Sequence, residues 1–283
     1  MLARAFAGQA RGFYIDVGAM DPVSDSVTQH FYALGWHGIN IEPSLQHYQH
    51  LVAARPRDLN LNVALGEREE TREFLDVPDS GLSRLGEDPP ASEAASSPSA
   101  TLRNVRVTTL AKIWAEHVGG RTVDFLKIDV EGWERHVIAG GDWQRFRPRI
   151  VLVEATRPNS AEPAWAEWEP DLLGNGYLFA WFDGLNRFYV RREEADLLRH
   201  FAVPPNVFDG FMPWRVERLM SDLEKARAEH ARLSESHLLL IAEQVETKAQ
   251  LAYVYGSKSW RVTAPLRWLV RHLGRSGTRA REP

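Results

Sequence analysis

The sequence contains no cysteine among its 283 residues. This absence excludes a disulfide framework, a thiolate zinc site, an iron–sulfur cluster and a thiol nucleophile. No stretch of the chain approaches the roughly 20 consecutive apolar residues that span a bilayer. The opening segment, Met1 to Gly8, is too short and too interrupted for the apolar region of a secretory leader. From these absences we expect a cytoplasmic protein.

Charge is distributed unevenly along the chain. The formal net charge is −4, yet the segment from Lys258 onward holds seven basic residues and one acid, so the preceding chain is more acidic than the total indicates. An acidic body argues against nucleic-acid binding. The basic tail, residues 256–283, also contains Trp260, Trp268 and several leucines. Such an amphipathic stretch suits an anionic membrane surface, and docking on an acidic surface of its own or a neighbouring subunit is the alternative.

Residues 1–210 alternate short apolar runs with amphipathic stretches, a pattern that predicts an α/β fold with a mostly parallel, doubly wound sheet. The expected strands are Gly12–Val17, Gly38–Ile41, Leu59–Val63, Val123–Ile128, Ile150–Glu154 and Tyr177–Phe182, with Arg187–Val190 as a hairpin partner of the last. The expected helices are Asp25–Leu34, Leu45–Ala54, Thr109–His117, Trp133–Ala139 and Ala164–Leu173. Between Val77 and Ala100 the composition shifts to Pro, Ser, Ala, Gly and acid, which predicts a long loop, either an inert insertion or a functional one.

Residues 214–255 predict a long helix that follows this body. Neither Pro nor Gly occurs from Arg215 to Tyr255, and a seam with alternating spacings of three and four residues runs through the segment. The seam comprises Leu219, Leu223, Ala226, His230, Leu233, His237, Leu240, Gln244, Thr247, Leu251 and Val254. Its polar members leave two uses open: self-association as a coiled coil to form a homo-oligomer, or docking on the chain's own body. The chain therefore divides into 1–210, 214–255 and 256–283.

Two expected strands end in motifs that suit a nucleoside ligand. The run Phe13-Tyr-Ile-Asp-Val-Gly-Ala19 ends in Asp-x-Gly, where the missing side chain of Gly18 allows a close approach of the backbone to a ligand. The second strand ends at Glu42, whose carboxylate could accept both hydrogen bonds of a ribose diol. Asp16 stands where the first glycine of a dinucleotide-binding fingerprint would be, and its charge would repel a pyrophosphate. The pair Asp16 and Glu42 describes S-adenosylmethionine better than a nicotinamide dinucleotide.

Two further strands deliver acids to the same edge of the sheet. The run Asp124-Phe-Leu-Lys-Ile-Asp129 carries Asp129 to its carboxyl end, with Lys127 on the same side of the strand because side chains alternate with a period of two. The next strand ends at Glu154. Acids are seldom buried without partners, so four carboxylates at four strand ends predict a site rather than a packing arrangement.

These motifs, in this order and spacing, resemble the FkbM family of S-adenosylmethionine-dependent methyltransferases. The resemblance rests on residues 13–19, 31–44, 61–67, 124–134, 149–155 and 179–190, and it covers roughly residues 12–210. It implies a class I methyltransferase (Rossmann-like) sheet and methyl transfer to oxygen, commonly on a sugar or glycan. The cofactor site that it implies comprises Asp16, Gly18, Ala19, Glu42 and Pro43, with Ala64 near the adenine. It also implies that Gly81, Leu82 and Ser83 belong to a lid over the site.

The tail from Gly256 is similar to the C-terminal ends of bacterial polysaccharide-assembly glycosyltransferases. This shorter likeness implies surface-glycan biosynthesis, and it adds a membrane-peripheral glycan-assembly complex at the inner face of the membrane as a partner for the tail. A non-enzymatic alternative is a methyltransferase-fold scaffold that uses residues 214–283 to recruit such a complex. A nicotinamide-dependent oxidoreductase is the less favoured enzymatic alternative, because the glycine fingerprint is missing.

A sugar hydroxyl is a weak nucleophile at neutral pH, so methyl transfer to it needs a general base or a metal ion. We predict that Asp129 and Glu154, with Glu131 nearby, are the catalytic residues. Two carboxylates, waters and substrate oxygens also form a plausible Mg²⁺ site, because this ion prefers hard oxygen ligands. The metal ligands would then be Asp129 and Glu154, whereas in the metal-free alternative one of the acids acts directly as the base.

Overall fold

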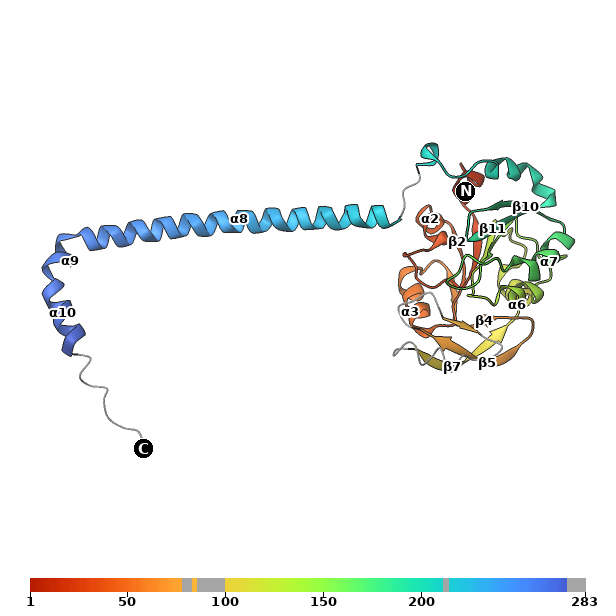
Figure 1. Ribbon diagram of the computed structural model, residues 1–283, viewed down its shortest axis with the longest axis horizontal. Helices are drawn as coiled ribbons and strands as arrows, with labels where there is room; N and C mark the ends of the chain where they lie inside the picture. Colours follow the sequence, from red (N-terminus) through yellow and green to blue (C-terminus); the bar gives the residue numbers. More distant parts are fainter. Residues whose placement is uncertain (78–82, 86–99, 211–213, 274–283) are drawn as a thin grey trace, which may run out of the picture. The chain divides into compact units, whose positions relative to one another are not determined.

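The computed structural model describes residues 1–77, 83–85, 100–210 and 214–273. The chain forms two compact units, Met1–Phe211 and Met212–Pro283. The first unit contains both β-sheets and both hydrophobic clusters of the protein's described residues, and the second is helical (Figure 1).

The main sheet of the first unit has seven strands in the order β10-β11-β9-β8-β1-β2-β3. The bounds are β1 Phe13–Val17, β2 His37–Ile41, β3 Leu59–Leu61, β8 Phe125–Ile128, β9 Ile150–Glu154, β10 Tyr177–Phe182 and β11 Asn186–Arg191. Strands β3, β2, β1, β8 and β9 are parallel to one another, and β11 runs antiparallel to both β9 and β10. The predicted fold class, a mostly parallel α/β sheet, is confirmed, as is the C-terminal hairpin.

Helices cover both faces of this sheet, with α2 and α3 on one side and α6 and α7 on the other (Figure 1). The α-helices of the first unit are α1 Leu2–Ala5, α2 Val27–Ala33, α3 Leu45–Ala54, α5 Leu110–Ile113, α6 Glu134–Ala139 and α7 Glu169–Gly174; a π-helix, Trp114–Val118, continues α5, and 3₁₀-helices occupy Trp165–Glu167, Arg192–Phe201 and Val207–Asp209. The predicted helix Ala164–Leu173 is divided in two, since a 3₁₀-helix precedes α7, which begins at Glu169. Pro170 lies in the first turn of α7, where the missing N–H is tolerated.

A second sheet, which the sequence did not predict, lies beside the main one. Its strands β4 (Ala64–Leu65), β5 (Glu70–Asp76), β6 (Arg84–Leu85) and β7 (Thr101–Thr108) are arranged in the order β4-β7-β5-β6. The described part of the predicted loop Val77–Ala100 thus includes a short strand, and most of that loop, with Gly81 and Leu82, lies outside the described residues. Strands β5 and β7 are rich in charged and exposed residues, and only Phe74, Leu75 and Val107 mark their buried parts as hydrophobic.

Alternation along the central strands sorts side chains between two hydrophobic clusters, one on each face of the sheet. Ile15, Leu126 and Val153 belong to the larger cluster, which also includes residues of the second sheet. Tyr14 and Phe125 belong to the smaller cluster, with Leu152 of β9. Because the period is two, the polar residues Asp16, Lys127 and Glu154 point to the side of the smaller cluster, at the carboxyl ends of their strands.

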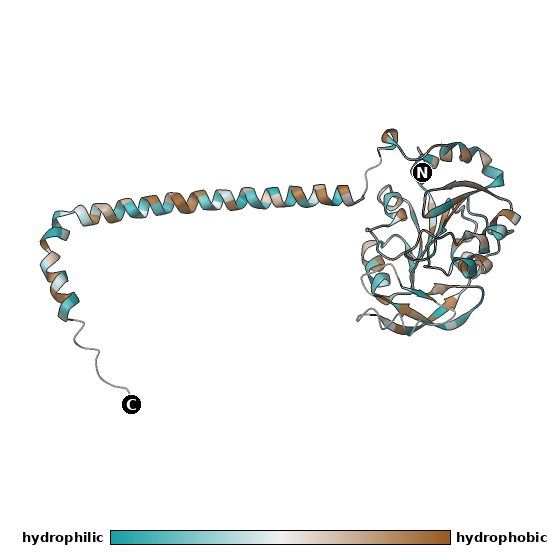
Figure 2. Ribbon diagram, viewed as in Figure 1, coloured by the Kyte–Doolittle hydropathy of each residue, from teal (hydrophilic) through white to brown (hydrophobic). Residues whose placement is uncertain are grey.

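The second unit consists of the long helix α8 (Trp214–Gly256), followed by α9 (Lys258–Val262) and α10 (Ala264–Leu273). The predicted long helix is therefore confirmed, and part of the basic tail is helical. Ser257 separates α8 from α9 and is the N-cap of α9. Its hydroxyl accepts a hydrogen bond from the Trp260 N–H. Apolar and polar residues alternate along α8 (Figure 2). Among the described residues, no helix has the length and apolar character needed to cross a membrane.

The turn after β1 packs directly against the end of β8. Gly18 has a φ of 74°, and a Cβ at this position would lie 1.8 Å from the carbonyl oxygen of Asp129. The neighbouring main chain is tied on both sides, since the Gly18 N–H donates to Ile41 O and the Asp129 N–H donates to Val17 O. The contact between these two strand ends thus requires a residue without a side chain at position 18. From the sequence, we had explained this glycine by the close approach of the backbone to a ligand.

We expect Gly18→Ala to destabilise the first unit more than a glycine substitution of similar backbone geometry. Gly35 also has a positive φ, 94°, but open space surrounds the position of its Cβ. Gly35→Ala should lower the melting temperature by about 2–4 °C, the effect of about 1 kcal/mol of backbone strain in a domain of this size. Gly18→Ala adds the collision with Asp129 and should lower it at least twice as far. Thermal unfolding by circular dichroism measures both, and equal shifts would contradict the proposed steric role.

Candidate active site

A cavity of about 290 Å³ opens at the carboxyl ends of β1, β2, β8 and β9. One wall comes from the turn after β1 and the end of β2, through residues such as Gly18, Ala19, Glu42 and Pro43. The second sheet supplies an apolar wall that includes Ala64, Leu65, Phe74 and Leu85. The remaining wall carries Lys127, Asp129, Glu131, Trp133 and Glu154. Carboxyl ends of parallel strands are where open α/β sheets bind ligands.

Glu42 shapes the β1–β2 side of the cavity. Its two carboxylate oxygens accept hydrogen bonds of 2.8 Å from the main-chain N–H groups of Met20 and Ser44. Burial raises the pKa of Glu42 to about 7, against the opposing effect of these two hydrogen bonds. Met20 has a positive φ of 47°, a conformation that is unfavourable for a residue with a side chain. The carboxylate of Glu42 therefore fixes a strained turn while it faces the cavity.

Lys127 lies at the centre of the site as a buried cation. Its Nζ donates a 2.9 Å hydrogen bond to Gly18 O. The same atom lies 3.2 Å from Asp16 Oδ1 and 3.3 Å from Asp129 Oδ2. Burial on its own lowers the pKa of Lys127, but the two carboxylates outweigh burial and raise it above its ordinary value. The lysine is therefore charged and joins the turn after β1 to the end of β8.

Asp16 lies behind the cavity wall. The residue is 1% exposed, it does not line the cavity, and its Oδ2 accepts a 2.9 Å hydrogen bond from the Thr28 hydroxyl. Its other oxygen faces Lys127, which is its direct neighbour in the register of β1 and β8. The carboxylate of Asp16 therefore contacts Lys127 and the start of α2. From the sequence, we had expected this carboxylate to contact a cofactor.

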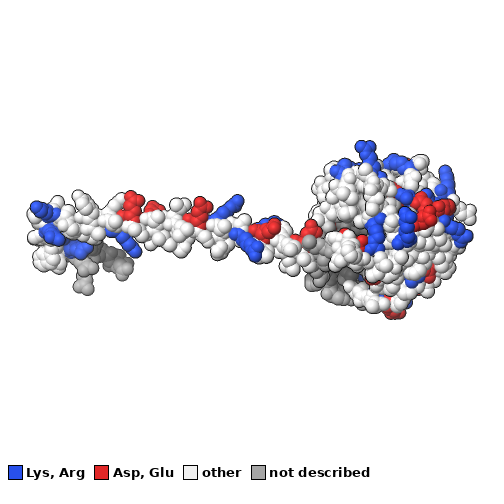
Figure 3. Space-filling model, turned by 90° about the horizontal axis from the view of Figure 1, so that it is seen from above, with Lys and Arg blue, Asp and Glu red and all other residues white. Residues whose placement is uncertain are grey.

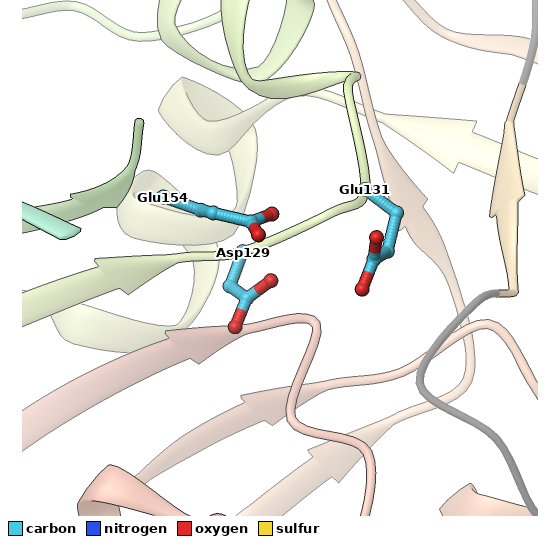
Figure 4. A group of neighbouring side chains, drawn as sticks. All are labelled: Asp129, Glu131 and Glu154. Carbon is cyan, nitrogen blue, oxygen red and sulfur yellow. The ribbon is translucent and has the colours of Figure 1, made fainter. Parts of the chain in front are cut away.

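Three acids lie close together on the side of the cavity away from Glu42 (Figure 4). Each of Asp129, Glu131 and Glu154 offers one carboxylate oxygen within 4.8 Å of the other two. Burial, together with the negative charges of its two neighbours, raises the pKa of Glu154 to about 9. Burial and the charge of Asp129 raise the pKa of Glu131 to about 7. Like charges at this distance disfavour full ionisation of the cluster, so it holds a proton at neutral pH.

The loop that carries two of these acids has an unusual backbone. Glu131 has a φ of 55° and Gly132 a φ of 96°. The buried carboxylate of Glu134 stabilises this loop, because its Oε1 accepts hydrogen bonds from the N–H groups of Val130 and Gly132 at 3.0 and 3.1 Å. Burial raises the pKa of Glu134 to about 7. Glu134 thus positions the loop and does not itself line the cavity.

Most of the residues predicted from the sequence line this one cavity. Those that do are Gly18, Ala19, Glu42, Pro43, Ala64, Asp129, Glu131 and Glu154, and Asp16 is the exception. Sequence reasoning placed Lys127 beside Asp129 but assigned it no role, and it missed Glu134. A lysine inside a buried strand was the available signal, since lysine is almost never buried without partners. Phe74 and Leu85 also line the cavity. No sequence pattern indicated this, because the sheet that carries them was not predicted.

The sequence pattern of the family described as "Methyltransferase FkbM domain" matches residues 16–179, more than half of the chain. Among solved structures, the chain is similar to methyltransferase FkbM from Methylobacillus flagellatus, with 15% identity and a TM-score of 0.37 over 66% of this chain and 47% of that one. It therefore spans about half the length of that protein. It is also similar to a TehB-like SAM-dependent methyltransferase from Corynebacterium glutamicum, with 8% identity and a TM-score of 0.38 over 67% of this chain and 85% of that one. No curated protein matches the chain.

The acid cluster predicts a dependence of stability on pH. The pKa of Glu154 is about 9 in the folded chain against 4.5 for a free side chain, so the folded state binds the extra proton between these values. The free energy of unfolding should therefore fall as pH rises from about 5 to about 9, and the contribution is fully present below the unfolded value.

In Glu154→Gln the neutral amide needs no proton, so this variant should lose less stability over the same range. Thermal unfolding in the presence of EDTA measures the difference, with Glu167→Gln as the control because Glu167 is exposed. If Glu154→Gln and the parent chain showed the same pH dependence, the elevated pKa of Glu154 would be disproved.

Proposed function

The chain belongs to the methyltransferase FkbM domain family, and on that premise we propose that it transfers a methyl group from S-adenosylmethionine to a hydroxyl group of a sugar or glycan. The observation that carries this proposal is a single cavity with two differently built sides. One side has the turn after β1, Glu42 and an apolar wall. The other side has a cluster of three carboxylates close enough to share a proton.

The first side fits the donor. S-adenosylmethionine presents a methyl group already activated on a positively charged sulfur, together with a ribose diol and an adenine. Glu42 would accept hydrogen bonds from the ribose hydroxyls, because each carboxylate oxygen has lone pairs beyond those used by Met20 and Ser44. The apolar side chains of Leu65 and Phe74 would pack against the adenine. A cavity lined by carboxylates also suits a cationic ligand better than the pyrophosphate of a nicotinamide dinucleotide.

The second side fits an acceptor alcohol. Carboxylates accept hydrogen bonds from hydroxyl groups, so the cluster would orient a sugar whose reacting oxygen faces the donor. Glu131, with a pKa of about 7, has the acidity expected of a general base that works near neutral pH. The hydroxyl proton would pass to this cluster as the oxygen becomes a nucleophile. Lys127 would hold Asp129 in place, because its Nζ lies 3.3 Å from that carboxylate.

A second candidate mechanism uses a divalent cation at the same three acids. One oxygen of Glu154, Oε2, is buried and has no hydrogen-bond partner among the described residues. A Mg²⁺ ion held by Asp129 and Glu154, with Glu131 beside them, would satisfy this oxygen and lower the pKa of a bound hydroxyl. The ion would also offset the repulsion among the three carboxylates.

A scaffold without catalytic activity would need none of these features. The fold contains a buried lysine between two carboxylates, beside a cluster of three acids. Burial of these charges lowers the stability of the fold, and a protein that only recruits partners would gain nothing in return. The glycan acceptor itself is inferred from the likeness of the family motifs and of the tail, and from the hydroxyl-accepting chemistry of the cluster. The cavity and its charges support an enzyme.

We expect Asp129→Asn to lower the rate of methyl transfer by at least about 100-fold, the smaller end of the effect of general acid–base groups. Affinity for S-adenosylmethionine should stay within a few-fold, because Asp129 lies on the acceptor side of the cavity. Radiolabelled methyl transfer to a glycan extract measures the rate, and calorimetry measures donor binding. Asp196→Asn is the control, since Asp196 is exposed and outside the cavity. Full activity of Asp129→Asn would remove this residue from the mechanism.

The metal candidate makes a separate prediction. Enzyme treated with EDTA should lose activity and regain it with Mg²⁺, because chelation removes the ion and restores repulsion among the acids. The same treatment should leave donor binding intact. Methyl transfer at the untreated rate in EDTA would leave the carboxylates as the only groups that assist deprotonation.

A further inference from the structure

The long helix α8 has no packing partner within its own unit along most of its length. All of its described side chains, from residue 216 to residue 256, are exposed. At 1.5 Å per residue, its 43 residues extend for about 65 Å. Large apolar side chains are among those exposed, including Leu233 at 65% and Leu240 at 60%. Helices in proteins gain most of their stability from packing of an apolar face, so a helix of this kind is expected to have a partner.

The apolar residues of α8 follow a heptad register, with positions a and d of each heptad forming one seam. Leucine or valine occupies both ends of the seam, at Leu219 and Leu223 and at Leu251 and Val254. The central layers alternate Leu233 and Leu240 at d with His230, His237 and Gln244 at a. A hollow on the helix surface coincides with this seam. Its lining residues, which include His237, Leu240, Gln244, Thr247, Glu243 and Lys248, all hold positions a, d, e or g.

The charges beside the seam select one arrangement of two helices. Acids occupy position g at Asp222, Glu229 and Glu243, and bases occupy position e at Arg227 and Lys248. In a parallel pair in register, each g residue faces the e residue five positions later on the partner helix. This brings Asp222 to Arg227 and Glu243 to Lys248. In an antiparallel pair, g faces g and e faces e, so like charges meet. Both signs are interspersed along the helix (Figure 3).

We propose that α8 forms a parallel, in-register, two-stranded coiled coil with the α8 of a second copy of this chain. The register places each polar a residue opposite its own copy. Polar residues at a reduce stability but specify register and the number of strands, so His230, His237 and Gln244 act as the alignment layers. The apolar layers at both ends and at Leu233 and Leu240 provide the buried surface.

The first test is the molar mass of the full-length protein by light scattering over a range of concentrations. We expect twice the chain mass of 32.1 kDa. Leu240→Asp, on the seam, should raise the dimer dissociation constant by about tenfold or more. Leu239→Asp is the matched control, because it has the same substitution and similar exposure at position c, away from the seam. A monomeric parent chain, a trimer or tetramer, or equal effects of the two variants would overturn the proposal.

Orientation is tested by cross-linking, which is simple in a chain without cysteine. The variants Leu219→Cys and Leu251→Cys each place one thiol on the seam, at positions d and a, near opposite ends of α8. In a parallel pair in register each variant should form a disulfide with itself under mild oxidation, because every seam residue faces its own copy. In an antiparallel pair position d faces position a, so position 219 would face position 251. If disulfides formed only when the two variants were mixed, the helices would be antiparallel and the proposed orientation would be wrong.

Register is tested by exchanging charges. Lys248→Glu should weaken the dimer by placing two acids opposite each other, and the added change Glu243→Lys should restore it. The mass measurement reports both effects. These variants lie outside the first unit, so the melting transition of that unit serves as a control for folding. Failure of the second change to restore the dimer would contradict the pairing of positions 243 and 248.

Discussion

The site depends on one buried cation, Lys127. Its ammonium group contacts a main-chain carbonyl of the turn after β1 and carboxylates from β1 and from the end of β8. A buried charge is stable only when such partners surround it, and Lys127 has two carboxylates as counter-charges. Lys127 therefore makes the arrangement of these strand ends cooperative. The residues facing the proposed donor and those facing the proposed acceptor are connected through it.

Much of this site was predictable from the sequence, because the fold imposes simple geometry. Parallel strands bring their carboxyl ends to one edge, so acids at the ends of β2 and β9 and just after β8 must lie near one another. Glu42, Asp129 and Glu154 follow this rule. Asp16 also follows it in position, yet its side chain faces inward. The alternation of side chains along a strand predicts the face of the sheet on which a residue lies. It does not predict whether that residue then meets the cavity or a neighbouring lysine.

The second sheet was not predictable from the same patterns. Its strands are short or largely exposed, and charged residues occupy most positions of β5, whereas β7 is mainly polar and exposed. Their pairing with each other, rather than burial, defines them. Helix α8 is the opposite case, since its heptad pattern and lack of Pro and Gly predicted it directly. A sequence therefore reveals elements through repeated burial or uninterrupted helix propensity, and it conceals those that depend on pairing with distant strands.

Glu131 illustrates a conflict between folding and chemistry. Its left-handed backbone, with a φ of 55°, suits glycine or asparagine better than glutamate, and strain of this kind costs about 1–3 kcal/mol. Selection for thermal stability alone would replace this residue. In the proposed mechanism the carboxylate of Glu131 assists the acceptor, so stability and activity would favour different residues at this position. A glycine at this position would relieve the backbone strain, and it would also remove one of the three acids that line the cavity.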